Sequence, residues 1–209
     1  MIQRVMLGLE ELFPEIVPEL NYNSDYQCLV AVMLSAQCTD KRVNQVTEVL
    51  FKDFGTAEQM TKLSQSELER MIYSLGFFRN KAKNVLAMSK VVVEKYGGQI
   101  PKTAEELEQL PGVGRKTANV VASALYGEQK IGVDTHVLRV TNRLGLVEAK
   151  TPLEVERQWY QKYPKYNNHD THLRLVLFGR YYCKAKKPSC DSCGFVDFCK
   201  YYKSKSEVK

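Results

Sequence analysis

Apolar residues recur at helical spacing along almost the whole chain, and this pattern restricts the fold more than any other feature. Val5, Leu9 and Leu12 lie three or four residues apart, and similar spacing returns in segments such as 68–75 and 85–92. This spacing is typical of amphipathic helices, whereas half-buried strands alternate with a period of two. Sustained alternation of that kind is hard to find here. The sequence therefore predicts an all-α fold of roughly ten short helices.

Capping residues and glycines mark the expected ends of these helices. Ser64 and Thr103 each stand three residues before a glutamate, so helices should begin just after them. Glycine favours helix C-termini, and the glycines placed to end helices are Gly76, Gly97, Gly98 and Gly127. The polar tail from Lys203 to Lys209 is of low complexity, and we expect it to be frayed.

Length and charge narrow the class of protein. A chain of 209 residues can bury a core without disulfides. The first residues carry charges inside their apolar stretch, and no apolar run is long enough for a bilayer, so we expect no signal peptide and no membrane partner. We expect a cytoplasmic monomer, associated with the nucleoid if the source is bacterial. The net charge of +6 favours an acidic partner such as nucleic acid.

Four cysteines near the C-terminus have the pattern of a ligand set. Cys183, Cys190, Cys193 and Cys199 are separated by six, two and five residues, within a basic and aromatic segment. In a reducing compartment such a cluster is more typical of metal binding than of disulfides. Four thiolates form closed structural zinc sites, and they also hold 4Fe-4S clusters. The two remaining thiols, Cys28 and Cys38, are expected to be buried and inert.

A very tight turn is predicted between a helix at 104–109 and a helix at 115–126. The turn contains Gly112, Val113 and Gly114, followed by Arg115. Glycines tolerate positive φ angles and let a partner approach the backbone closely. The amides of the turn and of the next helix can then converge on one anion, such as a DNA phosphate. An ordinary helix–helix turn is the alternative interpretation.

Five segments in order resemble the endonuclease III family of helix-hairpin-helix DNA glycosylases, and together they span most of the chain. They are Leu34–Asp40, Gly76–Ala82, Leu110–Lys116, Gly132–Val140 and the four cysteines. The resemblance implies two helical lobes, one formed by residues 18–128 and the other by 1–17 with 129–209. The hairpin in the first lobe and Asp134 in the second would face a cleft. It also implies a 4Fe-4S cluster, rather than zinc, in the cysteine loop.

The resemblance assigns catalysis to Lys116 and Asp134. A primary amine attacks a sugar carbon only when neutral, and a partly desolvated position in the first turn of a helix disfavours the ammonium form. Asp134 occupies a natural N-cap position, where an ionised carboxylate can also stabilise a positively charged sugar. The implied enzyme is a bifunctional DNA glycosylase and abasic-site lyase. It would excise oxidised pyrimidines from duplex DNA and nick the strand 3′ to the site by β-elimination, in base excision repair.

The damaged nucleotide must leave the duplex for this chemistry, so other residues must fill the gap. The positions that match the gap-filling loops of the family are Gln37 and Phe77, although Phe77 stands where the family pattern has leucine. The alternative for Phe77 is an ordinary core residue. We expect further contacts with the DNA backbone from His136 and from the cluster-loop lysines, which are Lys184, Lys186 and Lys187.

Two other functions remain open from the sequence. The first is a monofunctional glycosylase of the adenine- or thymine-removing types, which usually lack a lysine at the position of Lys116. The second is a non-catalytic DNA-binding module, because similar hairpins occur in proteins that only bind phosphates. Lys116 and Asp134 together argue against the second.

Overall fold

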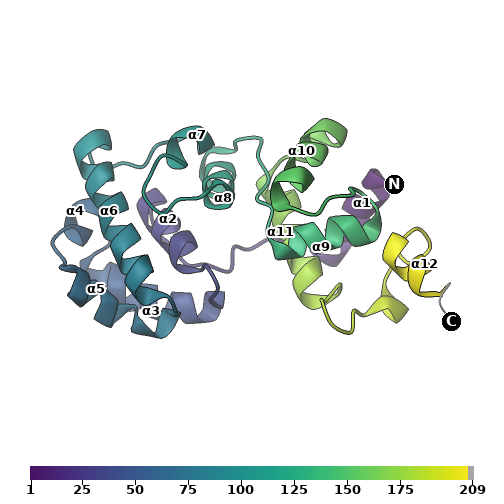
Figure 1. The fold of residues 1–209 in the computed structure, drawn as a ribbon, viewed down its shortest axis with the longest axis horizontal. Coiled ribbons are helices and arrows are strands. Elements are labelled where there is room, and N and C mark those ends of the chain that lie inside the picture. Colours follow the sequence, from purple (N-terminus) through teal and green to yellow (C-terminus); the bar gives the residue numbers. More distant parts are fainter. Residues whose placement is uncertain (207–209) are drawn as a thin grey trace. The chain divides into compact units, whose positions relative to one another are not determined.

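The chain folds into helices joined by turns (Figure 1), as a computed structural model describes it for residues 1–206. Within that range there are twelve α-helices and three short 3-10 helices, and no strand. The prediction of an all-α fold is confirmed. None of the helices in this range has the length and apolar character needed to cross a membrane.

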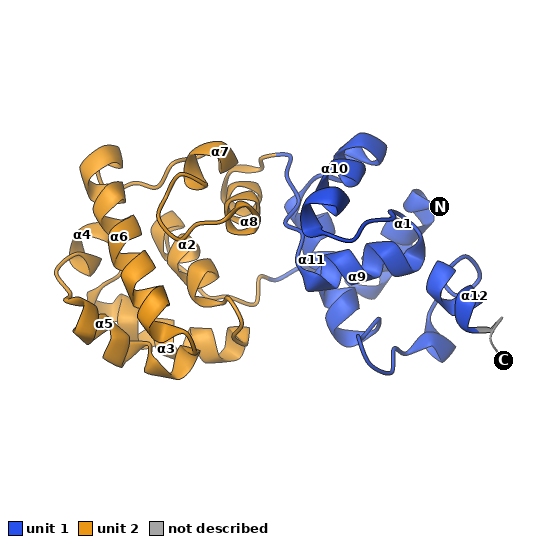
Figure 2. Ribbon diagram, in the orientation of Figure 1, with its two compact units in different colours: residues 1–17, 129–209 blue, residues 18–128 orange. Residues whose placement is uncertain are grey.

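The chain forms two compact units (Figure 2). One consists of Pro18–Glu128, and the other combines Met1–Val17 with Gln129–Lys209. Each unit has a hydrophobic core of its own. The chain therefore enters the unit formed by residues 18–128 after its N-terminal helix and leaves it again after Glu128.

Helix α2 is the centre of the unit formed by residues 18–128. Seven of its ten residues are buried, because it packs against α3, α6 and α8. A helix that is apolar on all sides is typical of such a central position. The elements of this unit are α2 (Asp25–Leu34), α3 (Asp40–Asp53), α4 (Ala57–Met60), α5 (Gln65–Met71), η1 (Tyr73–Leu75), α6 (Phe78–Tyr96), α7 (Ala104–Leu107) and α8 (Arg115–Tyr126).

In the other unit, α9 packs against α10, α11 and α12, while α1 packs on α11. The largest fully buried side chains of this core are Trp159 and Phe178. Trp159 also donates a hydrogen bond from Nε1 to the carbonyl oxygen of Tyr166 at 3.3 Å. The elements are α1 (Ile2–Leu12), α9 (Thr135–Leu144), α10 (Pro152–Lys162), η2 (Pro164–Tyr166), α11 (His169–Tyr181), η3 (Cys190–Ser192) and α12 (Lys200–Ser206).

Most helix ends lie where the capping signals predict them. Ser64 and Thr103 accept hydrogen bonds from the backbone three residues ahead, and Gly97 and Gly127 end their helices in the left-handed conformation. The helix predicted at 104–109 ends earlier, at Leu107.

The prediction of a frayed tail is wrong for residues 203–206, because α12 extends to Ser206 and packs against α9. The rest of the predicted tail, 207–209, lies outside the described residues.

Replacing Trp159 by alanine should destabilise the protein strongly. Its side chain is 0% exposed, and truncation of a buried tryptophan typically costs about 3–5 kcal/mol. Leu153→Ala on the same helix is the control, since Leu153 is 41% exposed and surface changes usually cost no more than about 0.5 kcal/mol. Far-UV circular dichroism during urea unfolding measures both, because the variant lacks the chain's single tryptophan. Equal stabilities of the two variants would contradict this packing.

Candidate functional site

The turn between α7 and α8 contains two glycines with different roles. Gly112 has a φ of +76°, and a Cβ there would lie 2.5 Å from Cβ of Asn84. Gly114 has an ordinary φ of −87°, so it does not use the tolerance of glycine for positive φ angles. No heavy atom lies within 4 Å of the Cβ position of Gly114. Gly112 is therefore required by packing inside the unit, whereas Gly114 leaves open space beside the backbone.

The N-terminus of α8 is open to an anion. Gly114 is its N-cap residue and has no side chain to accept hydrogen bonds from the first turn. In contrast, Thr39 caps α3 and Asn168 caps α11 with side-chain oxygens. Uncapped N–H groups at the positive end of a helix form a binding site for phosphate groups. Arg115 adds a positive charge there, and its Nη1 lies 3.7 Å from Oε2 of Glu108.

Lys116 lies in the first turn of α8, and its side chain is exposed. The expected partial desolvation of Lys116 is therefore wrong for the protein by itself. The charge of Lys116 interacts electrostatically with Asp40, a residue to which the sequence assigned no role. Burial raises the pKa of the Asp40 carboxyl, and the charge of Lys116 acts in the opposite direction. In the sequence, Asp40 stands out only as the last residue of the segment Leu34–Asp40 that resembles the family.

Asp134 is the N-cap residue of α9, as predicted. Its Oδ1 accepts hydrogen bonds from the backbone N–H groups of His136 at 2.8 Å and of Val137 at 2.9 Å. A negatively charged group at this end of a helix interacts favourably with the helix dipole. A hydrogen bond holds the segment that precedes Asp134, since Nδ1 of the buried His172 lies 2.7 Å from the carbonyl oxygen of Gly132.

Gln37 and Phe77 share an uncommon backbone conformation. Their φ angles are +54° and +50°, a region that residues other than glycine rarely adopt. Both help to line a pocket of about 240 Å³, together with Gly112 of the hairpin. Phe77 is 64% exposed and precedes α6, so its interpretation as a core residue is wrong. The hairpin and both predicted gap-filling residues therefore lie around one pocket.

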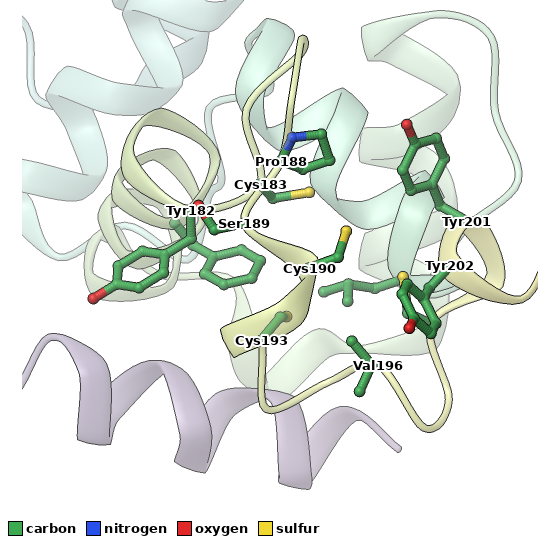
Figure 3. A pocket seen from close by; sticks show the side chains of 12 residues that line it. Tyr182, Cys183, Pro188, Ser189, Cys190, Cys193, Val196, Tyr201 and Tyr202 are labelled. Carbon is green, nitrogen blue, oxygen red and sulfur yellow. The ribbon is translucent and has the colours of Figure 1, made fainter. Parts of the chain in front are cut away.

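The four C-terminal cysteines line a single pocket whose other walls are largely apolar (Figure 3). The sulfur atoms of Cys183 and Cys190 point toward the side of the pocket where Tyr201 and Tyr202 lie. Within residues 1–206, no three His, Cys, Asp or Glu side chains are grouped as ligands of one metal ion. The prediction that Cys28 and Cys38 are both buried holds for Cys28, whereas Cys38 is only half-buried.

These thiols influence one another electrostatically. Burial raises the pKa of the Cys190 thiol, and Cys183 and Cys199 raise it further. Burial also raises the pKa of Cys193, and the neighbouring cysteines add to that effect while a hydrogen bond from the backbone of Phe195 opposes it. Metal ligation requires thiolates, and neighbouring thiolates repel one another. A bound cationic group would reduce that repulsion. The donor set therefore fits a metal group held by sulfur.

Arg143 fixes the loop that follows Cys183. Its guanidinium donates to the carbonyl oxygens of Lys184 at 2.7 Å and Ala185 at 3.0 Å, and lies 4.1 Å from the ring centroid of Tyr201. Its Nη1 is also 3.6 Å from Sγ of Cys183. The sequence assigned no role to Arg143, because a basic residue in the last turn of a helix is common.

The remaining predicted DNA contacts lie in the unit formed by residues 1–17 and 129–209. Lys184, Lys186 and Lys187 are all exposed on the loop between Cys183 and Cys190. His136 is half-buried on α9, where its Nδ1 lies 3.1 Å from Nη2 of Arg139. The unit formed by residues 18–128 thus carries Lys116, the hairpin and the residues at 37 and 77. The other unit carries Asp134, His136 and the cysteine loop.

Several known proteins are similar to this chain. Residues 30–165 match the model of the HhH-GPD superfamily base excision DNA repair proteins. The chain is 47% identical to endonuclease III of Bacillus subtilis (strain 168) over 191 residues, which cover 91% of this chain and 87% of that protein. It is 39% identical to endonuclease III of Escherichia coli (strain K12) over 197 residues, which cover 94% of this chain and 93% of that protein.

Solved structures agree with these similarities. A trapped endonuclease III–DNA covalent intermediate has a TM-score of 0.93 at 42% identity, covering 98% of this chain and 97% of that one. A thermostable thymine-DNA glycosylase, at 24% identity, shares the fold with a TM-score of 0.83. The chain therefore belongs to the HhH-GPD superfamily of base excision DNA repair proteins and, within it, to the endonuclease III family.

Proposed function

We propose that this base excision repair glycosylase removes oxidised pyrimidines from duplex DNA and then cleaves the strand at the resulting site, with Lys116 as nucleophile. The observation that carries the proposal is the exposed amine of Lys116 beside the uncapped N-terminus of α8. A phosphate held by the hairpin amides would bring the adjacent deoxyribose within reach of this amine. Bound DNA would also exclude water from the lysine, which favours the neutral nucleophile.

The reaction begins when Nζ of Lys116 forms a bond to C1′ of the extruded nucleotide. The bond from C1′ to the base breaks, and the electron pair leaves with the base, which takes up a proton. Opening of the sugar ring gives a Schiff base between Lys116 and C1′. Its positive charge acidifies the C2′ proton, whose removal expels the 3′ phosphate by β-elimination. Water then hydrolyses the Schiff base and frees the enzyme.

Asp134 would stabilise the positive charge that develops on the sugar as the base departs. Its Oδ1 is held by two backbone N–H groups, so the carboxylate is fixed before substrate binds. A preorganised charge costs no reorganisation during the reaction, which is why such groups stabilise transition states strongly. The same side chain would therefore serve as helix cap and as catalytic group.

The exposed Phe77 and Gln37 would occupy the space that the flipped nucleotide leaves. An aromatic ring can stack on neighbouring bases in place of the leucine of the family pattern. The hairpin residues from Gly112 to Arg115 would bind the backbone phosphate. His136 and the exposed lysines 184, 186 and 187 would contact the backbone from the other unit, formed by residues 1–17 and 129–209. The enzyme would act as a monomer in the cytoplasm, at the nucleoid if the source is bacterial.

The four thiols around one pocket support a 4Fe-4S cluster held by Cys183, Cys190, Cys193 and Cys199. When bound, the cluster would organise the loop that presents the three lysines and take no part in base excision. Arg143 would hold the same loop from α9 through its hydrogen bonds to the loop carbonyls. A steep dependence of DNA affinity on salt would follow from these cations.

Lys116→Ala should abolish covalent trapping by borohydride on duplex DNA that contains an oxidised pyrimidine. The variant lacks the amine that forms the Schiff base, but it keeps the hairpin amides, so DNA affinity should fall by less than about tenfold. Gel electrophoresis of the trapped adduct and a filter-binding assay measure the two effects. Lys102→Ala, at another exposed lysine of the same unit, is the control and should trap normally. Base release by the wild type without strand cleavage would instead indicate a monofunctional glycosylase.

Asp134→Asn separates the two roles of Asp134. Asparagine caps helices about as well as aspartate, so stability should be kept while excision slows by about a hundredfold or more. Asp134→Ala should slow excision similarly and also cost about 1 kcal/mol of stability. Single-turnover excision and thermal unfolding measure these effects. Normal excision by Asp134→Asn would leave this residue with a structural role alone.

Metal analysis tests the proposed cluster. The purified protein should contain iron and acid-labile sulfide in about equal amounts, as a 4Fe-4S cluster requires. Cys190→Ser should lose most of this iron, whereas Cys28→Ser, at a buried thiol outside the loop, should retain it. One zinc ion per chain, without sulfide, would contradict the cluster and support the simpler tetrahedral site.

A further inference from the structure

The turn before α6 holds two successive residues in left-handed conformations. The φ angles are +47° at Gly76 and +50° at Phe77. Glycine adopts this region readily, but phenylalanine does so at a cost and keeps it only where the surrounding structure enforces it. The side chain of Phe77 is 64% exposed, so packing of its ring does not enforce the conformation. The restraint must act on the backbone.

Lys81 holds this turn on both sides of Gly76. Its backbone N–H donates to the carbonyl oxygen of Phe77 at 3.0 Å, and its Nζ donates to the carbonyl oxygen of Leu75 at 2.8 Å. Hydrogen bonds from a charged donor are stronger than those between neutral groups. A single residue of α6 therefore fixes the two carbonyl groups that flank the left-handed glycine.

The burial of Lys81 indicates that its charge serves a purpose beyond packing. The residue is only 8% exposed, whereas lysines are almost never buried unless they are paired. Burial lowers the pKa of its ammonium group, and the nearby thiol of Cys38 acts in the opposite direction. An apolar side chain would fill the same space without this cost. The charged donor is therefore explained by the carbonyl that it binds.

The same helix also contacts the hairpin. Asn84 lies one turn after Lys81 and occupies the space where a side chain at Gly112 would be. Lys81, Asn84 and Gly112 line the pocket that Phe77 also borders. The first two turns of α6 thus set the position of the Phe77 turn relative to the phosphate-binding hairpin within one unit.

We propose that Lys81 is a positioning residue, which holds the Phe77 turn in its left-handed conformation so that the ring projects outward for insertion into DNA. This inference rests on the proposed function, in which Phe77 fills the space of the extruded nucleotide. Lys81 itself does not touch the substrate and acts through Phe77. Removal of its charge should let the turn relax and misplace the ring.

Lys81→Met tests the inference, because methionine keeps an unbranched side chain and removes the charged donor. The probe is a duplex with a tetrahydrofuran abasic analogue and 2-aminopurine opposite it, whose fluorescence rises when the base loses its stacking. The wild type should raise this fluorescence on binding, and Lys81→Met should lose most of the rise, as should Phe77→Ala. Lys83→Met, at an exposed lysine two residues along α6, should behave as the wild type.

Single-turnover excision on an oxidised pyrimidine duplex gives a second readout. Lys81→Met should slow it by about tenfold, since small misplacements of positioning groups have effects of this order or larger. In the double variant with Phe77→Ala, the rate should stay within about twofold of Phe77→Ala alone, because both changes act through the same ring. Independent, multiplicative losses would overturn the inference, as would a normal fluorescence rise with Lys81→Met.

Rescue distinguishes positioning from general destabilisation. Lys81→Arg keeps a cationic donor and should retain most of the fluorescence rise; a loss as large as that of Lys81→Met would contradict the role of the charge. Circular dichroism checks folding, and if Lys81→Met does not fold, Lys81→Gln replaces it with the same expectations.

Failure of the proposed function and failure of the role of Lys81 give different results. If the wild type excises no oxidised pyrimidine, the proposed function fails, but the fluorescence rise on the abasic duplex needs no excision and still tests Lys81. If the wild type and Phe77→Ala behave as expected and Lys81→Met behaves as the wild type, only the role of Lys81 is overturned.

Discussion

The first turn of α8 leaves its backbone N–H groups without a side-chain cap, and the proposed chemistry depends on that opening. The N-cap residue, Gly114, has free space where a side chain would be, while Gly112 is forced to be small by Asn84 from within the unit. Packing therefore sets the shape of the hairpin from one side, and the other side remains open to a phosphate. Lys116, on the same turn, is exposed where such a phosphate would bring the sugar.

The residues proposed to act on DNA lie repeatedly at the N-terminal ends of helices. At α8 an uncapped end offers its amides to an anion, whereas at α9 the capping carboxylate of Asp134 satisfies two amides and remains a fixed negative charge. At α6 the N-cap residue is the left-handed Phe77, and the adjoining turn is tied down by Lys81. Each arrangement uses ordinary helix-end hydrogen bonds to hold a side chain or an amide that, in the proposed function, would contact DNA.

The sequence predicts the helices and much of the candidate site, but not the conformations that tertiary contacts impose. Apolar spacing and caps such as Ser64 and Asp134 are local signals, and the structure confirms them. The left-handed Phe77 and the buried Lys81 depend on contacts that no local pattern in the sequence predicts. The same holds for Asp40, whose carboxyl interacts with the charge of Lys116 from a distant segment of the chain.

The central claim is that the amine of Lys116 forms the covalent bond to the sugar. Peptide mapping of the reduced protein–DNA adduct by tandem mass spectrometry tests it directly, because borohydride leaves a stable deoxyribose fragment on the attacking residue. The account predicts that the fragment lies on Lys116, in the peptide that begins the helix at Arg115. A fragment on another lysine, or on the N-terminal amine, would contradict it.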